Sequence, residues 1–160
     1  HVLAFHPGGG DLAAAEFAAE VVLLGGDPKQ DPTARYGAGS PAWLARPATL
    51  SFDPAGRLWI GSDQGGEISA TADGLYAMDV RGPGKYVLEA AYFAPLGAAV
   101  GGIGFSPKGR AGFVMVRHPG AVPGADFAKP ATRWPTVRAD MPPQSALIGL
   151  ARRDGGRLGG

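Results

Sequence analysis

Residues 50–63, LSFDPAGRLWIGSD, alternate apolar and polar positions on both sides of a central turn. Leu50 and Phe52 precede the turn, and Leu58 and Ile60 follow it, each pair separated by one residue. A period of two is typical of a β-strand with one face buried. The pattern therefore predicts a β-hairpin.

The turn of this hairpin is predicted by Asp53-Pro54-Ala55-Gly56. Asp53 can cap the turn with its side chain, and Pro54 sets the φ angle that the second position of a type I turn requires. Gly56 accepts the left-handed conformation that follows such a turn. Tight turns of this kind let a chain rich in Gly and Pro form ordered strands.

The same hairpin pattern recurs along the chain. Residues 103–116, IGFSPKGRAGFVMV, repeat it with a turn at Ser106 to Gly109, and Phe105 follows Phe52 by 53 residues. A looser copy, LAFHPGGGD, begins at Leu3. Repeats of about 40 to 55 residues, each a short meander of strands, are typical of β-propeller blades. We expect the two clear hairpins to occupy equivalent positions in neighbouring blades.

The chain is therefore predicted to be all-β, a partial β-propeller of roughly three blades joined by long Pro/Gly loops. We expect residues 1–160 to form a single partial propeller domain that belongs to a larger propeller, because closed propellers usually have four to eight blades. One helix is predicted, over Asp11–Ala19, with Asp11 as its cap. The other expected segments are strands at 2–5, 20–24, 75–80, 84–93 and 147–150 and long loops at 25–47 and 119–144.

Composition narrows the functional classes. The chain has 27 Gly and 15 Pro but also 45% hydrophobic residues, which favours short strands and turns over disorder. It has no Cys, which excludes disulfides and thiolate metal sites. The net charge of +1 gives no footprint for nucleic acid or an anionic membrane, and no apolar run is long enough to span a bilayer.

The chain contains a series of motifs, which are HVLAF with VVLLGGDP, RPATLSFDPAGRLWIGSD, PLGAAVGGIGFSPKGRAGFVMVRHPGA, RWP and SALIGLARRDGGRLGG. Taken in their order and spacing, they resemble the PhoX-type alkaline phosphatases. These are secreted calcium- and iron-dependent phosphatases built on a β-propeller, and the chain is similar to the C-terminal portion of such a protein. The resemblance implies phosphomonoester substrates and a periplasmic or secreted location, although the chain shows no signal peptide.

The chain departs from the family pattern at three acidic positions. Ala48, Ala99 and Ala121 stand where the family carries a carboxylate, whereas Asp53 and Asp63 are retained. Calcium prefers hard oxygen ligands, which alanine cannot supply. The resemblance thus implies calcium and iron for the family and makes their binding by this chain doubtful.

Asp63 and Glu67 are the candidate metal ligands. Asp63 follows a predicted strand, with Gln64 beside it, where propeller loops place functional side chains. A turn-capping role explains Asp63 equally well. Asp53 is better explained by the turn described above.

Arg46 and Arg117 are the candidate substrate-binding residues, because a guanidinium can hold a phosphate through paired N–H donors. Strand-end arginines are more often simply solvated. His118 is treated as structural, since a metal site needs several ligands at fixed spacing. HPGGGD lacks the Lys-Ser/Thr ending and the helix of a phosphate-binding loop, and His6 is taken as a turn residue. Spacing identifies no catalytic residue.

Three functions remain open. The chain can be part of a metal-dependent phosphomonoesterase that is inactive alone, a non-catalytic or degenerate propeller module, or, less well supported, a calcium-dependent lactonase-type propeller. An incomplete propeller exposes strand edges and apolar faces. We expect Val21–Leu24, Leu147–Leu150 or both to lie at such a face, where the chain would self-associate or bind the remaining blades.

Overall fold

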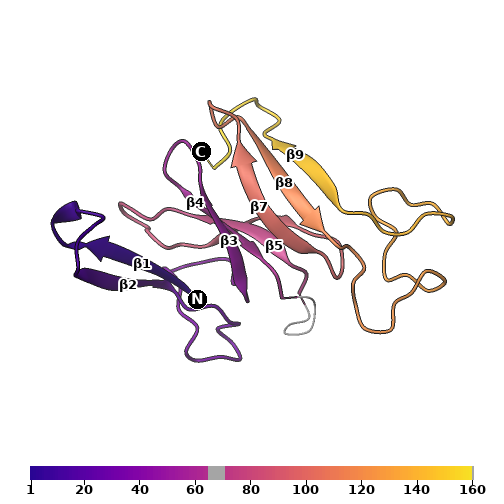
Figure 1. The fold of residues 1–160 in the computed structure, drawn as a ribbon, viewed down its shortest axis with the longest axis horizontal. Coiled ribbons are helices and arrows are strands. Elements are labelled where there is room, and N and C mark those ends of the chain that lie inside the picture. The colour runs from indigo at the N-terminus through magenta and orange to yellow at the C-terminus, as the bar shows by residue number, and fades with distance from the viewer. Residues whose placement is uncertain (65–70, 160) are drawn as a thin grey trace.

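The fold is all-β, as predicted, and consists of three antiparallel sheets arranged like part of a β-propeller (Figure 1). A computed structural model describes residues 1–64 and 71–159. The sheets have two, four and three strands in sequence order, as consecutive blades of a propeller do. The elements are β1 (Val2–Pro7), the 3₁₀ turn η1 (Gly8–Gly10), β2 (Phe17–Leu23), β3 (Pro47–Phe52), β4 (Leu58–Ser62), β5 (Gly74–Met78), β6 (Glu89–Phe93), β7 (Ala99–Phe105), β8 (Ala111–Arg117) and β9 (Ala146–Ala151).

Both predicted hairpins are present with their predicted turns. The Gly56 amide donates to the Asp53 carbonyl at 2.9 Å, and the Gly109 amide donates to the Ser106 carbonyl at 2.8 Å. Both glycines have positive φ, 86° and 65°. The hairpins open the second and third sheets, and a Cβ on Gly109 would lie 3.5 Å from the ring of Pro54, so the two turns are adjacent. They hold equivalent positions in neighbouring sheets, as expected.

Strands β4 and β5 are buried on both faces and separate two apolar cores. Successive side chains of a strand point to opposite faces, so alternate residues enter different cores. The first core, toward the β1–β2 sheet, contains Val2, Val22, Leu23, Leu44, Leu58, Ile60, Tyr76, Met78 and Leu88. The second core, toward the β7–β8–β9 sheet, contains Trp59, Leu75, Ala77, Ala94, Ala98, Val100, Ile103, Val114 and Val116.

The predicted helix over Asp11–Ala19 is wrong. Turns follow Asp11, and β2 begins at Phe17, pairing with Pro7 of β1. The alanines favour a helix intrinsically, but the strand pairing and the burial of Val22 and Leu23 at its end override that preference. In the part of the chain that the structure describes, no helix is long and apolar enough to cross a bilayer.

Two further strands are shorter than predicted. The segment expected as a strand from 84 to 93 forms β6 only from Glu89, because turns around Gly82 and Gly84 occupy its first half. The strand expected over 75–80 is β5, Gly74–Met78. Both differences lie at the β5–β6 turn, where Tyr86 adopts a φ of 68° and its amide donates to the Asp79 carbonyl.

Hydrogen bonds of the Tyr36 side chain hold the long loop at 25–47 together. The Tyr36 hydroxyl lies 2.9 Å from the carbonyl of Gly26 and 3.0 Å from that of Leu44, and it accepts from both residues' amides at 3.1 Å. Burial raises the pKa of Tyr36, so the hydroxyl stays protonated and able to donate. A single side chain thus joins the two ends of the loop beneath the first core.

The first sheet covers only part of the second sheet. A groove of about 450 Å³ runs between β1 and β3 and is lined by Leu3, Phe5, Leu50, Phe52, Leu58 and Val80, among others. Of the segments expected at an open face, Leu147 is 61% exposed on β9. In the other segment, Val21–Leu24, the residues Val22 and Leu23 pack in the first core. Of the two segments, the one on β9 therefore presents an exposed side chain at Leu147.

Candidate functional site

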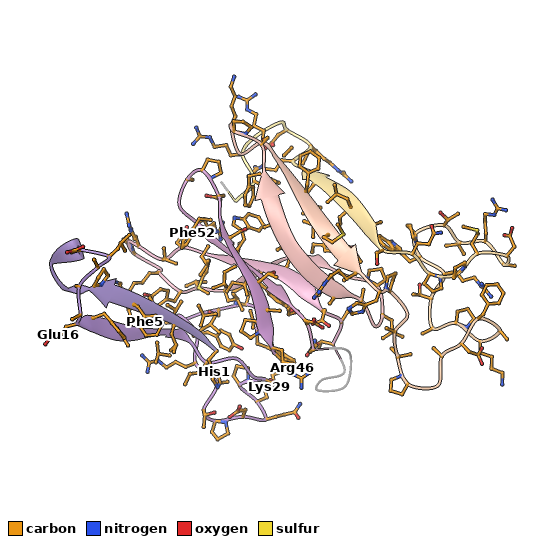
Figure 2. The ribbon with its side chains drawn as sticks, in the orientation of Figure 1. His1, Phe5, Glu16, Lys29, Arg46 and Phe52 are labelled. Carbon is orange, nitrogen blue, oxygen red and sulfur yellow. The ribbon has the colours of Figure 1, made fainter. Side chains whose placement is uncertain are left out.

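Three of the candidate residues meet at one end of the second and third sheets. Arg46 directly precedes β3, Asp63 directly follows β4, and Arg117 is the last residue of β8. Antiparallel pairing brings the start of each hairpin beside its end, as in the pair Ala99 and Arg117. Figure 2 shows Arg46 at the opposite end of β3 from Phe52, which adjoins the hairpin turn. We call the end that carries Arg46, Asp63 and Arg117 the arginine rim.

An ion pair across the rim joins two sheets. The Arg117 guanidinium donates to the Asp63 carboxylate at 2.9 Å, and the Asp63 amide donates to the Arg46 carbonyl at 3.1 Å. The side chains of Asp63 and Arg117 are 36% and 45% exposed, so solvent reaches both. An exposed pair of this kind contributes little to stability, which leaves the side chains able to exchange partners.

Two residues of the rim have an unusual backbone. Arg46 has a φ of 44° and His118 a φ of 34°, and each directly precedes a proline. Positive φ is costly for a residue with a side chain, and strained residues gather at functional sites. The His118 amide is held by the Ser145 hydroxyl at 3.0 Å. The strained residues are thus Arg46 itself and His118, which directly follows Arg117.

A buried polar network beneath the rim was not predicted from the sequence. The Asp73 carboxylate, 2% exposed, accepts from the Ser62 hydroxyl at 2.6 Å and the Gln64 amide at 2.8 Å. The Ser62 hydroxyl in turn accepts from the Gly74 amide at 3.0 Å. Ser62 and Gln64 flank Asp63, so the network fixes the backbone that presents it. Burial, followed by the Asp73 charge, raises the pKa of neighbouring Tyr76 to about 12.

The described residues do not fit a calcium or iron site. Within residues 1–64 and 71–159, no three His, Asp or Glu side chains gather closely enough to hold a metal ion. The Asp63 carboxylate forms an ion pair with Arg117. A calcium ion takes six to eight oxygen ligands, which this one carboxylate cannot supply. Glu67 lies outside the described residues. Ala99, one of the positions where the resemblance implies a carboxylate, is fully buried beside the rim.

Two arginines lie at the rim. Arg46 directly precedes β3 and Arg117 ends β8, and the Arg117 guanidinium donates to the Asp63 carboxylate. The fold and the rim together define a partial β-propeller with an arginine-lined edge.

Comparisons with known proteins identify the family. The sequence profile described as "Alkaline phosphatase PhoX" matches residues 1–120. The chain therefore belongs to the PhoX alkaline phosphatase family. No curated protein sequence matches it.

The chain is also similar to a solved structure, PhoX of Pseudomonas fluorescens in complex with vanadate, a transition-state analogue. The sequences are 26% identical and the TM-score is 0.78. The similarity covers 98% of this chain and 27% of that one, so the chain spans about a quarter of its relative.

Proposed function

We propose that this chain is the C-terminal part of a PhoX-type phosphomonoesterase, that it forms a single partial propeller domain, and that it is inactive alone. The observation that carries the proposal is the placement of Arg46 and Arg117 on the arginine rim, in a chain that belongs to the PhoX family. The proposed location, resting on the family, is the periplasm or the cell exterior.

The proposed role of the rim is to bind the phosphoryl group of a phosphomonoester. Arg117 and Arg46 supply charged N–H donors at the ends of β8 and β3. Asp63 holds Arg117 in place when no anion is present, and its negative charge opposes an approaching phosphate. The positive φ of Arg46 supports this role, because strained backbone is common at functional sites.

In this proposal, the metal ions are bound by parts of the protein outside this chain. Calcium and iron in the family would polarise the phosphoryl oxygens. Asp63 is engaged by Arg117, and alanine stands at 48, 99 and 121. We therefore assign this chain substrate contacts and no step that runs through a metal.

A second candidate is a non-catalytic propeller module. The ion pair between Asp63 and Arg117 favours the non-catalytic module, because the Asp63 carboxylate neutralises the charge of Arg117. The three alanines at 48, 99 and 121 favour it as well. The two candidates differ in whether the rim binds an anion.

The first test measures phosphate release from a generic aryl phosphate, with calcium and iron supplied. We expect no turnover above background. Robust turnover that Asp63→Asn abolishes would show that the isolated chain is an enzyme and that Asp63 acts in it.

The second test measures binding of vanadate to the isolated chain by calorimetry. We expect Arg117→Ala to weaken binding at least tenfold, and Asp63→Asn to strengthen it, because the substitution frees Arg117 and removes a negative charge. Arg138→Ala is the matched control, since Arg138 pairs with Asp140 in an exposed loop. Equal binding by all four proteins would favour the non-catalytic module.

A further inference from the structure

Cationic side chains gather at the end of the third sheet that lies away from the arginine rim. Two of them flank Gly109 in the β7–β8 turn, and three follow β9. Figure 1 shows this turn and the segment after β9 together at the top of the molecule. All five side chains are exposed, and we call them the basic tip: Lys108, Arg110, Arg152, Arg153 and Arg157.

Strand pairing places two of these cations next to each other. Ala111 of β8 pairs with Ala151 of β9. Arg110 directly precedes Ala111, and Arg152 directly follows Ala151, so the two arginines lie at the same end of neighbouring strands. Neighbouring strands are about 4.8 Å apart, so the backbone alone keeps these positions close.

The segment after β9 then folds back over the β7–β8 turn. The Leu158 amide donates to the Gly109 carbonyl at 2.8 Å, and Leu158 packs against the second core. The Gly159 carbonyl accepts from the Arg57 guanidinium at 2.9 Å. These contacts hold Arg157 beside the turn and its two cations.

The basic tip has little negative charge to balance it. Asp154 pairs with Arg152 at 2.8 Å and is the only acidic residue in 106–111 and 152–159. Five cations and one carboxylate leave these two segments with a formal charge of +4. The net charge of +1 averages the tip with carboxylates elsewhere, so the composition of the chain gives no sign of it.

Gathering these charges does not stabilise the fold. Within residues 1–64 and 71–159, the side chains of Lys108, Arg110, Arg153 and Arg157 form no hydrogen bond or ion pair. Repulsion between like charges destabilises a compact state. The segment after β9 is held by the backbone and by Leu158 and Arg57, so the four charges are available to a partner.

The placement of the charges favours a flat anionic surface over a nucleic acid. The cations lie on turns that end a sheet, and not along a helix or strand that could enter a groove of a duplex. Residues 106–111 and 152–159 include no aromatic side chain on which single-stranded bases could stack. Each Lys or Arg near an anionic bilayer adds about fivefold to the affinity.

We propose that the basic tip binds an anionic lipid bilayer through contacts with its headgroup phosphates. The arginine rim lies at the opposite end of the same strands, where Ala99 pairs with Arg117. A chain bound by its basic tip therefore turns the rim away from the bilayer, toward the aqueous phase. The inference goes beyond the proposed function and does not depend on it.

Co-sedimentation with lipid vesicles tests the proposal. We expect the purified chain to bind vesicles of equimolar phosphatidylcholine and phosphatidylglycerol, and not vesicles of phosphatidylcholine alone. Lys108→Gln with Arg110→Gln, and Arg153→Gln with Arg157→Gln, should each weaken binding about thirtyfold, since each variant removes two cations. High salt should release the chain. Binding to neutral vesicles, or binding that persists in high salt, would show an apolar contact and overturn the proposal.

The matched control is Lys29→Gln with Arg35→Gln. It removes the same charge from exposed positions in the 25–47 loop and should bind the anionic vesicles like the parent chain. An equal loss in the control and the tip variants would reflect net charge alone and would overturn the proposal. Tighter binding of a DNA duplex than of anionic vesicles would identify a nucleic-acid partner and would also overturn it.

Urea denaturation separates this role of the basic tip from a structural one. The two tip variants should be at least as stable as the parent chain, because they relieve repulsion between like charges. A loss of stability in both variants would show that these side chains serve the fold, and would contradict the proposal.

Discussion

The indole Nε1 of Trp59 donates a hydrogen bond of 3.0 Å to the Asp53 carboxylate, and both residues are buried. The other carboxylate oxygen accepts from the amides of Ala55 and Arg57 at 2.8 and 3.0 Å. One side chain therefore forms the turn and satisfies the only side-chain N–H of the tryptophan. The role of Asp53 as a turn residue, predicted from its place before Pro54, is confirmed.

Asp53→Ala should lower the free energy of unfolding by about 1–3 kcal/mol, because the buried indole N–H is left without a partner. Urea denaturation measures the change. Asp126→Ala is the control, since Asp126 accepts from the Lys129 amide in an exposed loop and should cost about 1 kcal/mol or less. Equal effects of the two substitutions would contradict the assigned role of the buried bond.

Gly61→Ala should destabilise the junction of the second and third sheets. A Cβ on Gly61 would clash with the Thr49 hydroxyl and would lie 2.7 Å from the Val100 carbonyl. Overpacking against backbone costs about 1–3 kcal/mol, measured by thermal or urea unfolding. Gly104→Ala is the matched control, because it lies in β7 with open space around the Cβ position. A neutral Gly61→Ala would mean that the sheets are less closely packed than described.

The Asp63–Arg117 pair should contribute little to stability despite its short distance. Because both side chains are partly exposed, a double-mutant cycle with Asp63→Asn and Arg117→Ala should give a coupling of about 0.2–1 kcal/mol. The coupling should fall in high salt. A salt-independent coupling several times larger would show that the rim is structural, and would weaken its assignment as an anion site.

Glu20 should make stability depend on pH in the acid range. Hydrogen bonds from Tyr86, Lys85 and His6, in that order, lower the pKa of Glu20 from its ordinary value of 4.5. Because the folded-state pKa is depressed, the stabilisation is fully present above pH 4.5 and is lost as the pH falls through the folded-state value.

Urea midpoints measured from neutral to acid pH test this prediction. The parent chain should lose more stability on acidification than Glu20→Gln does, whereas Glu16→Gln should behave like the parent, since Glu16 forms no ion pair within the described residues. Parallel profiles for the parent and Glu20→Gln would contradict the assigned linkage.

Local patterns in the sequence predicted the hairpins and the candidate rim residues. They did not predict the strand pairing of β2 or the hydrogen-bond network around Asp73. Ser106 to Gly109 and Asp53 to Gly56 specify turns through residues adjacent in the chain, so short-range rules suffice. The helix predicted over Asp11–Ala19 failed because pairing with β1, a partner outside the segment, decided its structure. The Asp73 network was missed because its members, Ser62, Gln64 and Asp73, meet only across the β4–β5 connection.

The sequence by itself determined the all-β class, the two turn sites and the resemblance to one family, because alternation, turn residues and motif order are properties of the chain alone. Tertiary structure decided that β4 and β5 separate two cores and that Asp63 meets Arg117. Arg117 lies 54 residues beyond Asp63. No local rule places two such residues 2.9 Å apart, since their distance depends on how the third sheet packs against the second.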